Sequence, residues 1–405
     1  MKPIVRAGRM KPVHSDIRGP LFVEAMNRQK QGIDILKLNT GNPATFGFGL
    51  PDSIKNALME HMQDGVGYCD FKGMPQARQA ICDYETSKGI KGITSDDVFI
   101  GNGVSEVVSF ALTPLLNDGD EVLVPSPSYS LWGNSIYLEG GKPVFYTCDE
   151  QANWYPDIQD IRSKITDKTK AIVIINPNNP TGVLYPKELL LEIIQIARES
   201  GLLIFADEIY DRLVMDGKQH ISLASLTEDV PVITLNGLSK SHCLCGYRCG
   251  WMVISGPREL TEDYRQGIIQ LTSLRLCANT MAQIVIPAAL DDMETPASMV
   301  RPGGRIYEQR EATVRELEKI DGLSFIKNDA AFYVFPKLDV KKFNITNDKQ
   351  FAHDLLDVTN ILLVPGSGFD WKDPDHFRIV MLPQADILSD AIRRMGTFLD
   401  GYKQK

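Results

Sequence analysis

Short apolar segments alternate with longer amphipathic ones between residues 95 and 255. About seven segments have the length and content of strands: 97–101, 121–125, 142–147, 171–176, 202–207, 231–236 and 250–255. Several are apolar at consecutive positions, which is typical of strands buried on both faces of a parallel sheet. The segments 105–116 and 187–200 have helical periodicity. The pattern therefore predicts an α/β fold with a mainly parallel sheet and helices on both faces.

The pattern changes in the last hundred residues. The long amphipathic segment 304–320 predicts a connecting helix, and apolar segments at 323–327, 331–336, 361–365 and 377–382 then alternate with polar, helix-compatible ones. This predicts a small α+β domain, and the first ~45 residues, which lack a strong strand pattern, are expected to pack with it. We therefore predict an N-terminal segment (1–50), a large domain (51–300) and a small C-terminal domain (301–405).

Composition narrows the class of protein. The formal net charge of −9 over 405 residues argues against a nucleic-acid-binding surface, which requires a basic patch. Seven cysteines, an odd number without regular spacing, argue against a disulfide framework, and the C-x-C-x3-C run at 243–249 is not a standard zinc spacing. No apolar run approaches the roughly 20 residues of a membrane helix. We expect a soluble cytoplasmic protein without a metal site.

Polar clusters follow four of the predicted strands. GNGVSE (101–106), NPNNPTG (176–182), ADEIYD (206–211) and NGLSK (236–240) each lie at the carboxyl end of an apolar segment. Ligands in open α/β sheets bind at that edge. We therefore predict that the four clusters converge on one binding site.

Each cluster has an ordinary structural interpretation beside a functional one. The glycine-rich turn could bind a phosphate through its backbone N–H groups, or be a capped strand-to-helix turn. Arg248 could bind the same phosphate or be a surface charge. Asp207 could pair with a pyridine nitrogen and keep it protonated, or cap a helix, and Asn179 could be a turn residue. Lys240 would become a nucleophile where a buried, partly cationic site lowers its pKa.

Taken together, the NPNNPTG, ADEIYD and SK-x7-R-x-G motifs resemble those of the class I, fold type I pyridoxal-phosphate-dependent aminotransferases, over nearly the whole chain. The resemblance implies that Lys240 is the catalytic lysine, bound to the cofactor as a Schiff base, and that Asp207 pairs with the pyridine nitrogen. It implies a cofactor site made of Val104, Ser105, Tyr129, Asn179, Asp207, Tyr210, Ser239, Lys240, Arg248 and, across a homodimer interface, Tyr68. It places Gly41, Asn179, Arg378 and Arg18 at the substrate.

One position departs from the family pattern. The family commonly has a phosphate-binding serine three residues before the lysine, and this chain has Gly237 there. The phosphate would then depend more on Ser105, Ser239 and Arg248.

A narrower set of segments is similar to bacterial glutamate–pyruvate (alanine) transaminases: DIRGP (16–20), LNTGNPATFGF (38–48), GYCDFKG (67–73), RLCAN (275–279) and PGGRIYEQR (302–310). This implies ping-pong amino transfer between alanine or glutamate and pyruvate or 2-oxoglutarate. Arg18 could bind the second carboxylate of glutamate, or be a charge beside the N-terminal segment. Aromatic or branched-chain substrates, or a β-lyase activity on the same scaffold, remain open from the sequence.

Overall fold

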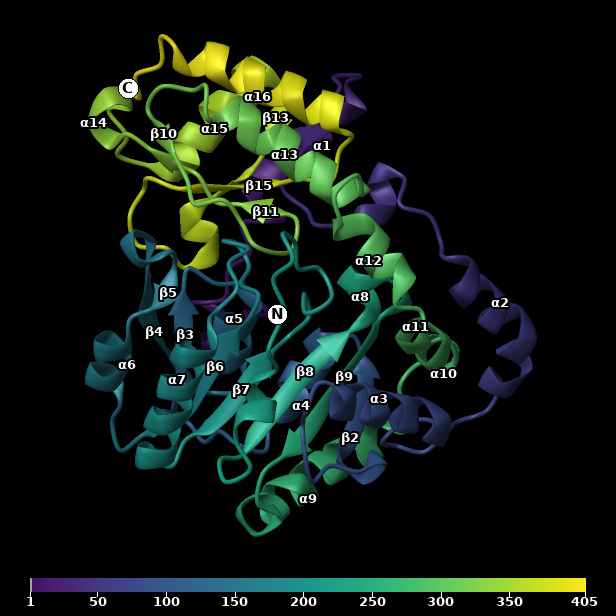
Figure 1. Cartoon of the computed structure of the whole chain (residues 1–405). Coiled ribbons are helices and arrows are strands. Elements are labelled where there is room, and N and C mark those ends of the chain that lie inside the picture. The colour runs from purple at the N-terminus through teal and green to yellow at the C-terminus, as the bar shows by residue number, and fades with distance from the viewer. Residues whose placement is uncertain (1) are drawn as a thin grey trace.

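An eight-stranded sheet forms the centre of the larger part of the computed structural model, which describes residues 2–405 (Figure 1). Across the sheet the strands are β2 (Val98–Asn102), β9 (Cys249–Ser255), β8 (Val232–Gly237), β7 (Leu203–Asp207), β6 (Thr169–Ile175), β3 (Glu121–Ser126), β4 (Lys142–Asp149) and β5 (Tyr155–Pro156). The neighbours from β8 to β4 pair in parallel, whereas β2, β9 and β5 pair antiparallel. The mainly parallel sheet is confirmed; the eighth strand, β5, has two residues and was too short to show a pattern.

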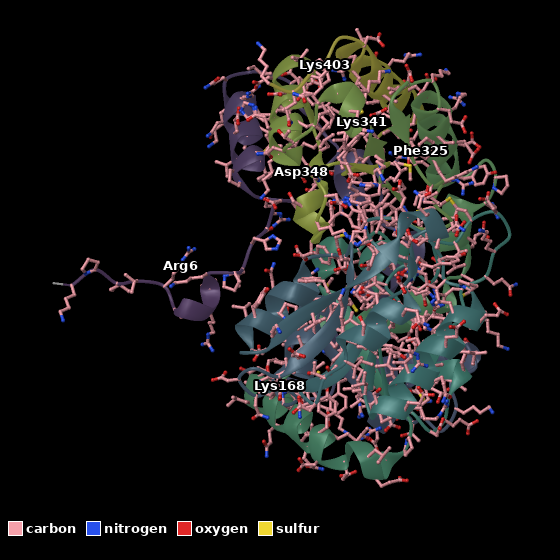
Figure 2. All side chains as sticks on the ribbon, turned by 90° about the vertical axis from the view of Figure 1, so that its left-hand side faces the viewer. Arg6, Lys168, Phe325, Lys341, Asp348 and Lys403 are labelled. Carbon is pink, nitrogen blue, oxygen red and sulfur yellow. The ribbon has the colours of Figure 1, made fainter. Side chains whose placement is uncertain are left out.

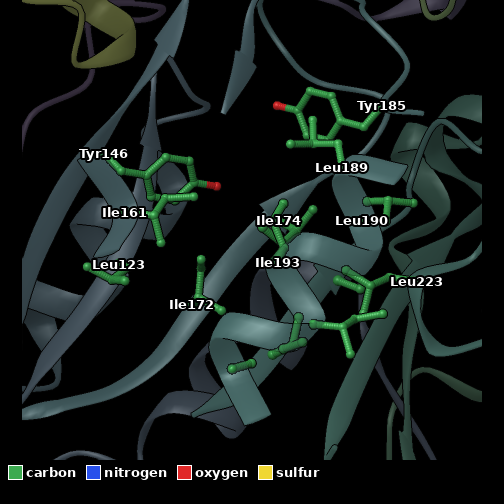
Figure 3. Packing of buried hydrophobic residues seen from close by; sticks show 14 of the residues in the cluster. Leu123, Tyr146, Ile161, Ile172, Ile174, Tyr185, Leu189, Leu190, Ile193 and Leu223 are labelled. Carbon is green, nitrogen blue, oxygen red and sulfur yellow. The ribbon is translucent and has the colours of Figure 1, made fainter. Parts of the chain in front are cut away.

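Helices cover both faces of this sheet, as predicted. One face carries α4 (Val104–Leu112), α5 (Leu131–Leu138) and α9 (Arg258–Arg275); the other carries α6 (Ile158–Lys164) and α7 (Lys187–Ser200). Alternate residues of one strand pack on the two faces. Ile172 and Ile174 lie on the α7 face (Figure 3), whereas Val173 belongs to the hydrophobic cluster of the opposite face. Both faces are apolar, which is why these strands lack polar alternation.

A third group of helices packs at the β2–β9 end of the sheet. It comprises α2 (Asp52–His61), α3 (Pro75–Ser87), α8 (Leu238–Ser241), α10 (Thr280–Ile284) and α11 (Ile286–Asp291), and α12 (Glu294–Val300) then leads toward the C-terminal region. Among residues 2–405 no single helix has the length and apolarity to cross a membrane; α9 followed by the segment Thr280–Asp291 meets that test as a pair bent by 120°.

The C-terminal region has a hydrophobic core of its own beside the large sheet (Figure 1). Its strands are β10 (Leu323–Ser324), β11 (Tyr333–Val334), β12 (Lys337–Leu338), β13 (Ile361–Leu362), β14 (Val364–Pro365) and β15 (Phe377–Val380). Its helices are α13 (Arg305–Leu317), α14 (Val340–Phe343), α15 (Asp348–Thr359) and α16 (Ala385–Leu399). The division into domains at residues 50 and 300 stays a prediction.

The N-terminal segment has two parts that lie in different places. Strand β1 (Leu36–Lys37) pairs in parallel with β13, and helix α1 (Pro20–Lys30) packs through Leu21 on the core of the C-terminal region. The residues around Arg6 extend away from the body of the molecule (Figure 2). Ile4 and Val5 in this arm are almost fully exposed.

Candidate active site

A cavity of about 880 Å³ opens at the carboxyl edge of the large sheet, between the sheet and the C-terminal region. Its lining includes Arg18, Gly41, Val104, Ser105, Tyr129, Asn179, Asp207, Tyr210, Ser239, Lys240, Arg248 and Arg378. Every predicted site residue except Tyr68 therefore meets at one place. Tyr68 is 84% exposed in the single chain and does not line the cavity.

The sheet topology explains this convergence. Strand β7 ends at Asp207, and β8 ends at Gly237, after which α8 carries Ser239 and Lys240. Because β6, β7 and β8 run in parallel, their carboxyl ends lie at one edge. Residues that are distant in sequence thus reach a common space.

Asp207 is buried and points toward the α5 face of the sheet. The indole Nε1 of Trp132 donates to its carboxylate at 3.0 Å, and the backbone N–H of Ile209 donates at 3.4 Å. Burial raises the pKa of Asp207 to about 6, and the hydrogen bond from Trp132 opposes part of that rise. Trp132 was not among the predicted site residues, although it lies three residues after Tyr129 in the SPSYSLW segment. A cationic ligand group at this carboxylate would favour its charged form.

Lys240 reaches across the cavity to the N-terminal segment. Its Nζ donates to the carbonyl of Gly41 at 2.9 Å and lies 3.9 Å from the thiol sulfur of Cys245. Burial disfavours the ammonium, but the nearby Tyr333, Cys245 and Tyr129 outweigh it, so the pKa of Lys240 is above its ordinary value. In the chain without ligand the pKa of Lys240 is therefore not lowered, because phenol and thiol groups surround the amine.

Two tyrosines and an asparagine form a hydrogen-bonded group beside Lys240. The hydroxyls of Tyr210 and Tyr333 lie 3.0 Å apart, and the amide of Asn179 donates to Tyr210 at 3.5 Å. Burial raises the pKa of Tyr210 well above its ordinary value, so its hydroxyl stays protonated. Tyr333, within the apolar AFYVFP segment, was missed because its pattern indicated only a strand. A Cβ at Gly41 would lie 2.3 Å from the Tyr333 hydroxyl, so this position requires glycine.

Arg378 is a buried cation on β15. Its guanidinium donates to the Asn179 side chain at 2.9 Å and to the carbonyl of Asn39. It lies 4.6 Å from the ring centres of both Tyr333 and Phe369. Among residues 2–405 its Nε has no hydrogen-bond partner. A buried guanidinium that lines a cavity is suited to bind a carboxylate.

The turn between β2 and α4 is built to leave room for an anion. Gly103 has φ +82°, and a Cβ there would lie 2.2 Å from the Arg248 guanidinium. Arg248 donates to the Cys245 carbonyl at 3.0 Å and to the Ser105 hydroxyl at 3.5 Å. The turn, the start of α4 and Arg248 thus offer N–H groups and positive charge to one point.

The same region explains why position 237 departs from the family pattern. Gly237 pairs with Gly250 between β8 and β9, and a Cβ at residue 237 would lie 2.5 Å from the carbonyl oxygen of Cys249. A Cβ at Gly250 would lie 2.4 Å from the backbone nitrogen of Val104. A serine at 237 would therefore require the strands to separate.

Arg18 belongs to the segment that closes the cavity from the N-terminal side. Ser15 and Ile17 line the cavity with it, and the carbonyl of Ile17 accepts a hydrogen bond from the Asn39 side chain at 2.8 Å. Arg18 also lines a neighbouring cavity of about 480 Å³. Its side chain therefore has space on two sides.

Comparisons with known proteins find similarity over nearly the whole chain. A family model described as aminotransferase class I and II matches residues 33–392. The chain is 50% identical over 404 residues to the glutamate-pyruvate aminotransferase AlaA of Haemophilus influenzae, and the match covers both chains fully. It is 45% identical over 404 residues to the alanine aminotransferase of Mycobacterium tuberculosis, and that match covers 100% of this chain and 94% of the relative. A crystal structure of an aminotransferase from Escherichia coli superposes with a TM-score of 0.98 at 46% identity, covering both chains fully.

Proposed function

This chain belongs to the class I and II aminotransferases, and from that premise we propose that it exchanges amino groups between alanine or glutamate and pyruvate or 2-oxoglutarate. Members of this family use pyridoxal phosphate. The observation that carries the proposal is the meeting, in one cavity, of Lys240, the buried Asp207 carboxylate and the buried Arg378 cation. We further propose a cytoplasmic homodimer, in which the exposed Tyr68 would serve the neighbouring copy.

The residues present fit pyridoxal phosphate. Its phosphate would be held at the Gly103 turn, where a side chain is excluded and the guanidinium of Arg248 lies close. The other phosphate donors would be Val104, Ser105 and Ser239. Tyr210 and Asn179 would hold the ring oxygen, and Tyr129 would stack on the ring.

The cofactor, when bound, supplies an electron sink for negative charge that develops at the substrate α-carbon. Asp207 would keep the ring nitrogen protonated. Burial raises the pKa of Asp207 to about 6, but a cationic ring nitrogen beside it would favour the charged carboxylate. Trp132 fixes the orientation of that carboxylate. Lys240 would hold the cofactor through its Nζ and, when free, would accept the proton of the α-carbon and return it.

The substrate would be oriented by charges on the opposite wall of the cavity. Arg378, which lines the cavity, would bind the α-carboxylate through its guanidinium. Gly41 would contribute its backbone to the same carboxylate. Arg18 would bind the second carboxylate of glutamate or 2-oxoglutarate, which alanine and pyruvate lack.

The test is a mixture of the purified, cofactor-loaded protein with L-glutamate and pyruvate, in which alanine and 2-oxoglutarate are measured together. Equal amounts of both products support the proposal. Conversion of the cofactor by glutamate without alanine formation would show that pyruvate is the wrong acceptor. Release of pyruvate and ammonia from cysteine-type substrates would indicate a lyase instead.

A further inference from the structure

A cluster of buried charges lies behind the turn that carries Asp207 and Tyr210, outside the cavity. Its members come from the end of α3 and from the residues after β7: Tyr84, Glu85, Lys88, Glu208 and Asp211. None of them lines the cavity. Asp207 points to the α5 face, whereas Glu208 contacts Ser222 and Leu223 on the α7 face. The cluster and the cavity therefore lie on opposite sides of the carboxyl end of β7.

Lys88 is the central cation of this cluster. Its Nζ lies 2.6 Å from the carboxylate of Glu85, 2.8 Å from that of Glu208 and 3.2 Å from that of Asp211. The three carboxylate side chains are between 0% and 3% exposed. Buried carboxylates without a cation are costly, so the position of this turn depends on the Lys88 ammonium.

The cluster connects two segments that reach the cavity. Glu208 directly follows Asp207, and its second oxygen accepts hydrogen bonds from the Ser222 hydroxyl at 2.9 Å and the Leu223 N–H at 3.0 Å. The carboxylate of Asp211 accepts from the Asn236 amide at 2.7 Å. The side-chain oxygen Oδ1 of Asn236 in turn accepts a hydrogen bond from the backbone N–H of Gly237 at 2.7 Å, three residues before Lys240.

Two other ionisable groups face the cluster. His220 lies 4.0 Å from the carboxylate of Glu208, and burial lowers its pKa, so it is neutral at neutral pH. Arg212 packs its guanidinium 4.3 Å from the Tyr84 ring centre and donates to the carbonyls of Ala289 and Leu290. His220, Glu208 and Asp211 are close enough together to hold a metal ion, but the Lys88 ammonium already contacts both carboxylates. The Lys88 ammonium thus occupies the place that a metal ion would take between these carboxylates.

We propose that Lys88 is a positioning residue for amino transfer: its ammonium fixes the turn bearing Asp207 against the segment bearing Lys240 and sets the charge around the cofactor. The inference rests on the proposed function, because it assumes that Asp207 and Lys240 hold pyridoxal phosphate. Lys88 would then affect catalysis although it does not line the cavity.

The test compares Lys88→Met, which keeps the apolar stem and removes the charge, with Lys91→Met as matched control. Lys91 lies three residues further along and pairs with Glu228 at 2.7 Å, with both side chains about two-thirds exposed. The readouts are the pH midpoint of the bound cofactor's absorbance change, the cofactor dissociation constant, and kcat and KM. These use the full-length, cofactor-loaded protein.

In Lys88→Met the unpaired carboxylates favour the cationic form of the cofactor linkage, so we expect the midpoint to rise by about one pH unit. Cofactor affinity and kcat should each fall by roughly tenfold, with KM within about twofold. Lys88→Arg should restore the midpoint to within a few tenths of a unit. Lys91→Met should leave all readouts at the wild-type values.

If Lys88→Met does not yield folded protein, Asp211→Asn provides the second measurement. Burial disfavours the charged Asp211 carboxylate, but the Lys88 ammonium holds its pKa below the ordinary value, so this variant removes a negative charge and the midpoint should fall. An unchanged midpoint in Lys88→Met would overturn the inference alone, and so would an unchanged midpoint in Asp211→Asn where Lys88→Met does not fold. A loss of thermal stability without any spectroscopic shift would also overturn it. A wild-type protein that binds no pyridoxal phosphate would overturn the proposed function together with it.

Discussion

The two walls of the cavity are built differently. On the sheet side, strands of five to seven residues end at or beside the functional groups, and the backbone there is tightly paired. On the other side, the C-terminal region has strands of two to four residues, and Arg378 projects from within β15 itself. Rigid, buried strand ends suit a cofactor that stays bound, whereas the other wall presents charge to ligands that enter and leave.

This difference implies that cofactor binding and substrate binding can be separated by mutation. Residues of the sheet wall should change cofactor affinity and the chemical step. Arg378 and Arg18, on the other wall, should change KM while the cofactor stays bound.

The largest effect is expected from Lys240→Ala on the sheet wall. Because the chain loses both the amine that holds the cofactor and the base for the α-proton, turnover should fall by at least about 10⁴-fold. Formation of alanine and 2-oxoglutarate measures it, with the exposed Lys168→Ala as control. Substantial residual transamination would refute the role of Lys240.

Asp207→Asn should weaken cofactor binding but stabilise the cofactor-free chain. Loss of the charge-assisted contact should weaken cofactor binding by roughly 10–100-fold. In the cofactor-free chain, the folded pKa of about 6 lies above the ordinary 3.8, so Asp207 lowers the free energy of unfolding progressively as the pH rises from about 4 to about 6. The variant should therefore be more stable by about 3 kcal/mol at pH 8 and lose that advantage below pH 4. Denaturant unfolding at the two pH values checks the sign, and a stability loss at pH 8 would contradict it.

Arg378→Lys tests the opposite wall. A lysine keeps the charge but loses the planar, two-pronged geometry, so KM for both the amino acid and the oxo acid should rise by about 10–100-fold. The absorbance of the bound cofactor should not change. The exposed Arg301→Lys is the control. Loss of the cofactor from Arg378→Lys would show that the two walls are not separable.

Arg18→Met is expected to have the smallest and most selective effect. KM for glutamate and 2-oxoglutarate should rise by about tenfold, because only these substrates carry a second carboxylate. The KM values for alanine and pyruvate should stay the same. Equal changes in KM for all four substrates would show that Arg18 stabilises the N-terminal segment and does not bind the second carboxylate.

Much of the molecule was predictable where its residues form long local patterns. Helix α7 has the predicted bounds, and the seven longer strands of the large sheet lie where the apolar segments predicted them. The short strands β5 and β1 were not predicted, because two residues carry no periodicity and pair only through contacts distant in sequence. The sites of Trp132 and Tyr333 were missed for a similar reason, since their side chains looked like ordinary core aromatics.

The sequence by itself determined the alternation of strands and helices, and the motifs that place Lys240, Asp207 and Arg248 at strand ends. Only the tertiary structure decided that Arg378 would be buried in the same cavity between the rings of Tyr333 and Phe369. It also decided that Gly237 cannot carry a side chain and that Lys88 neutralises the carboxylates behind Asp207. Local patterns reflect interactions between near neighbours in the chain, whereas burial, close approach and charge pairing arise only when distant segments pack together.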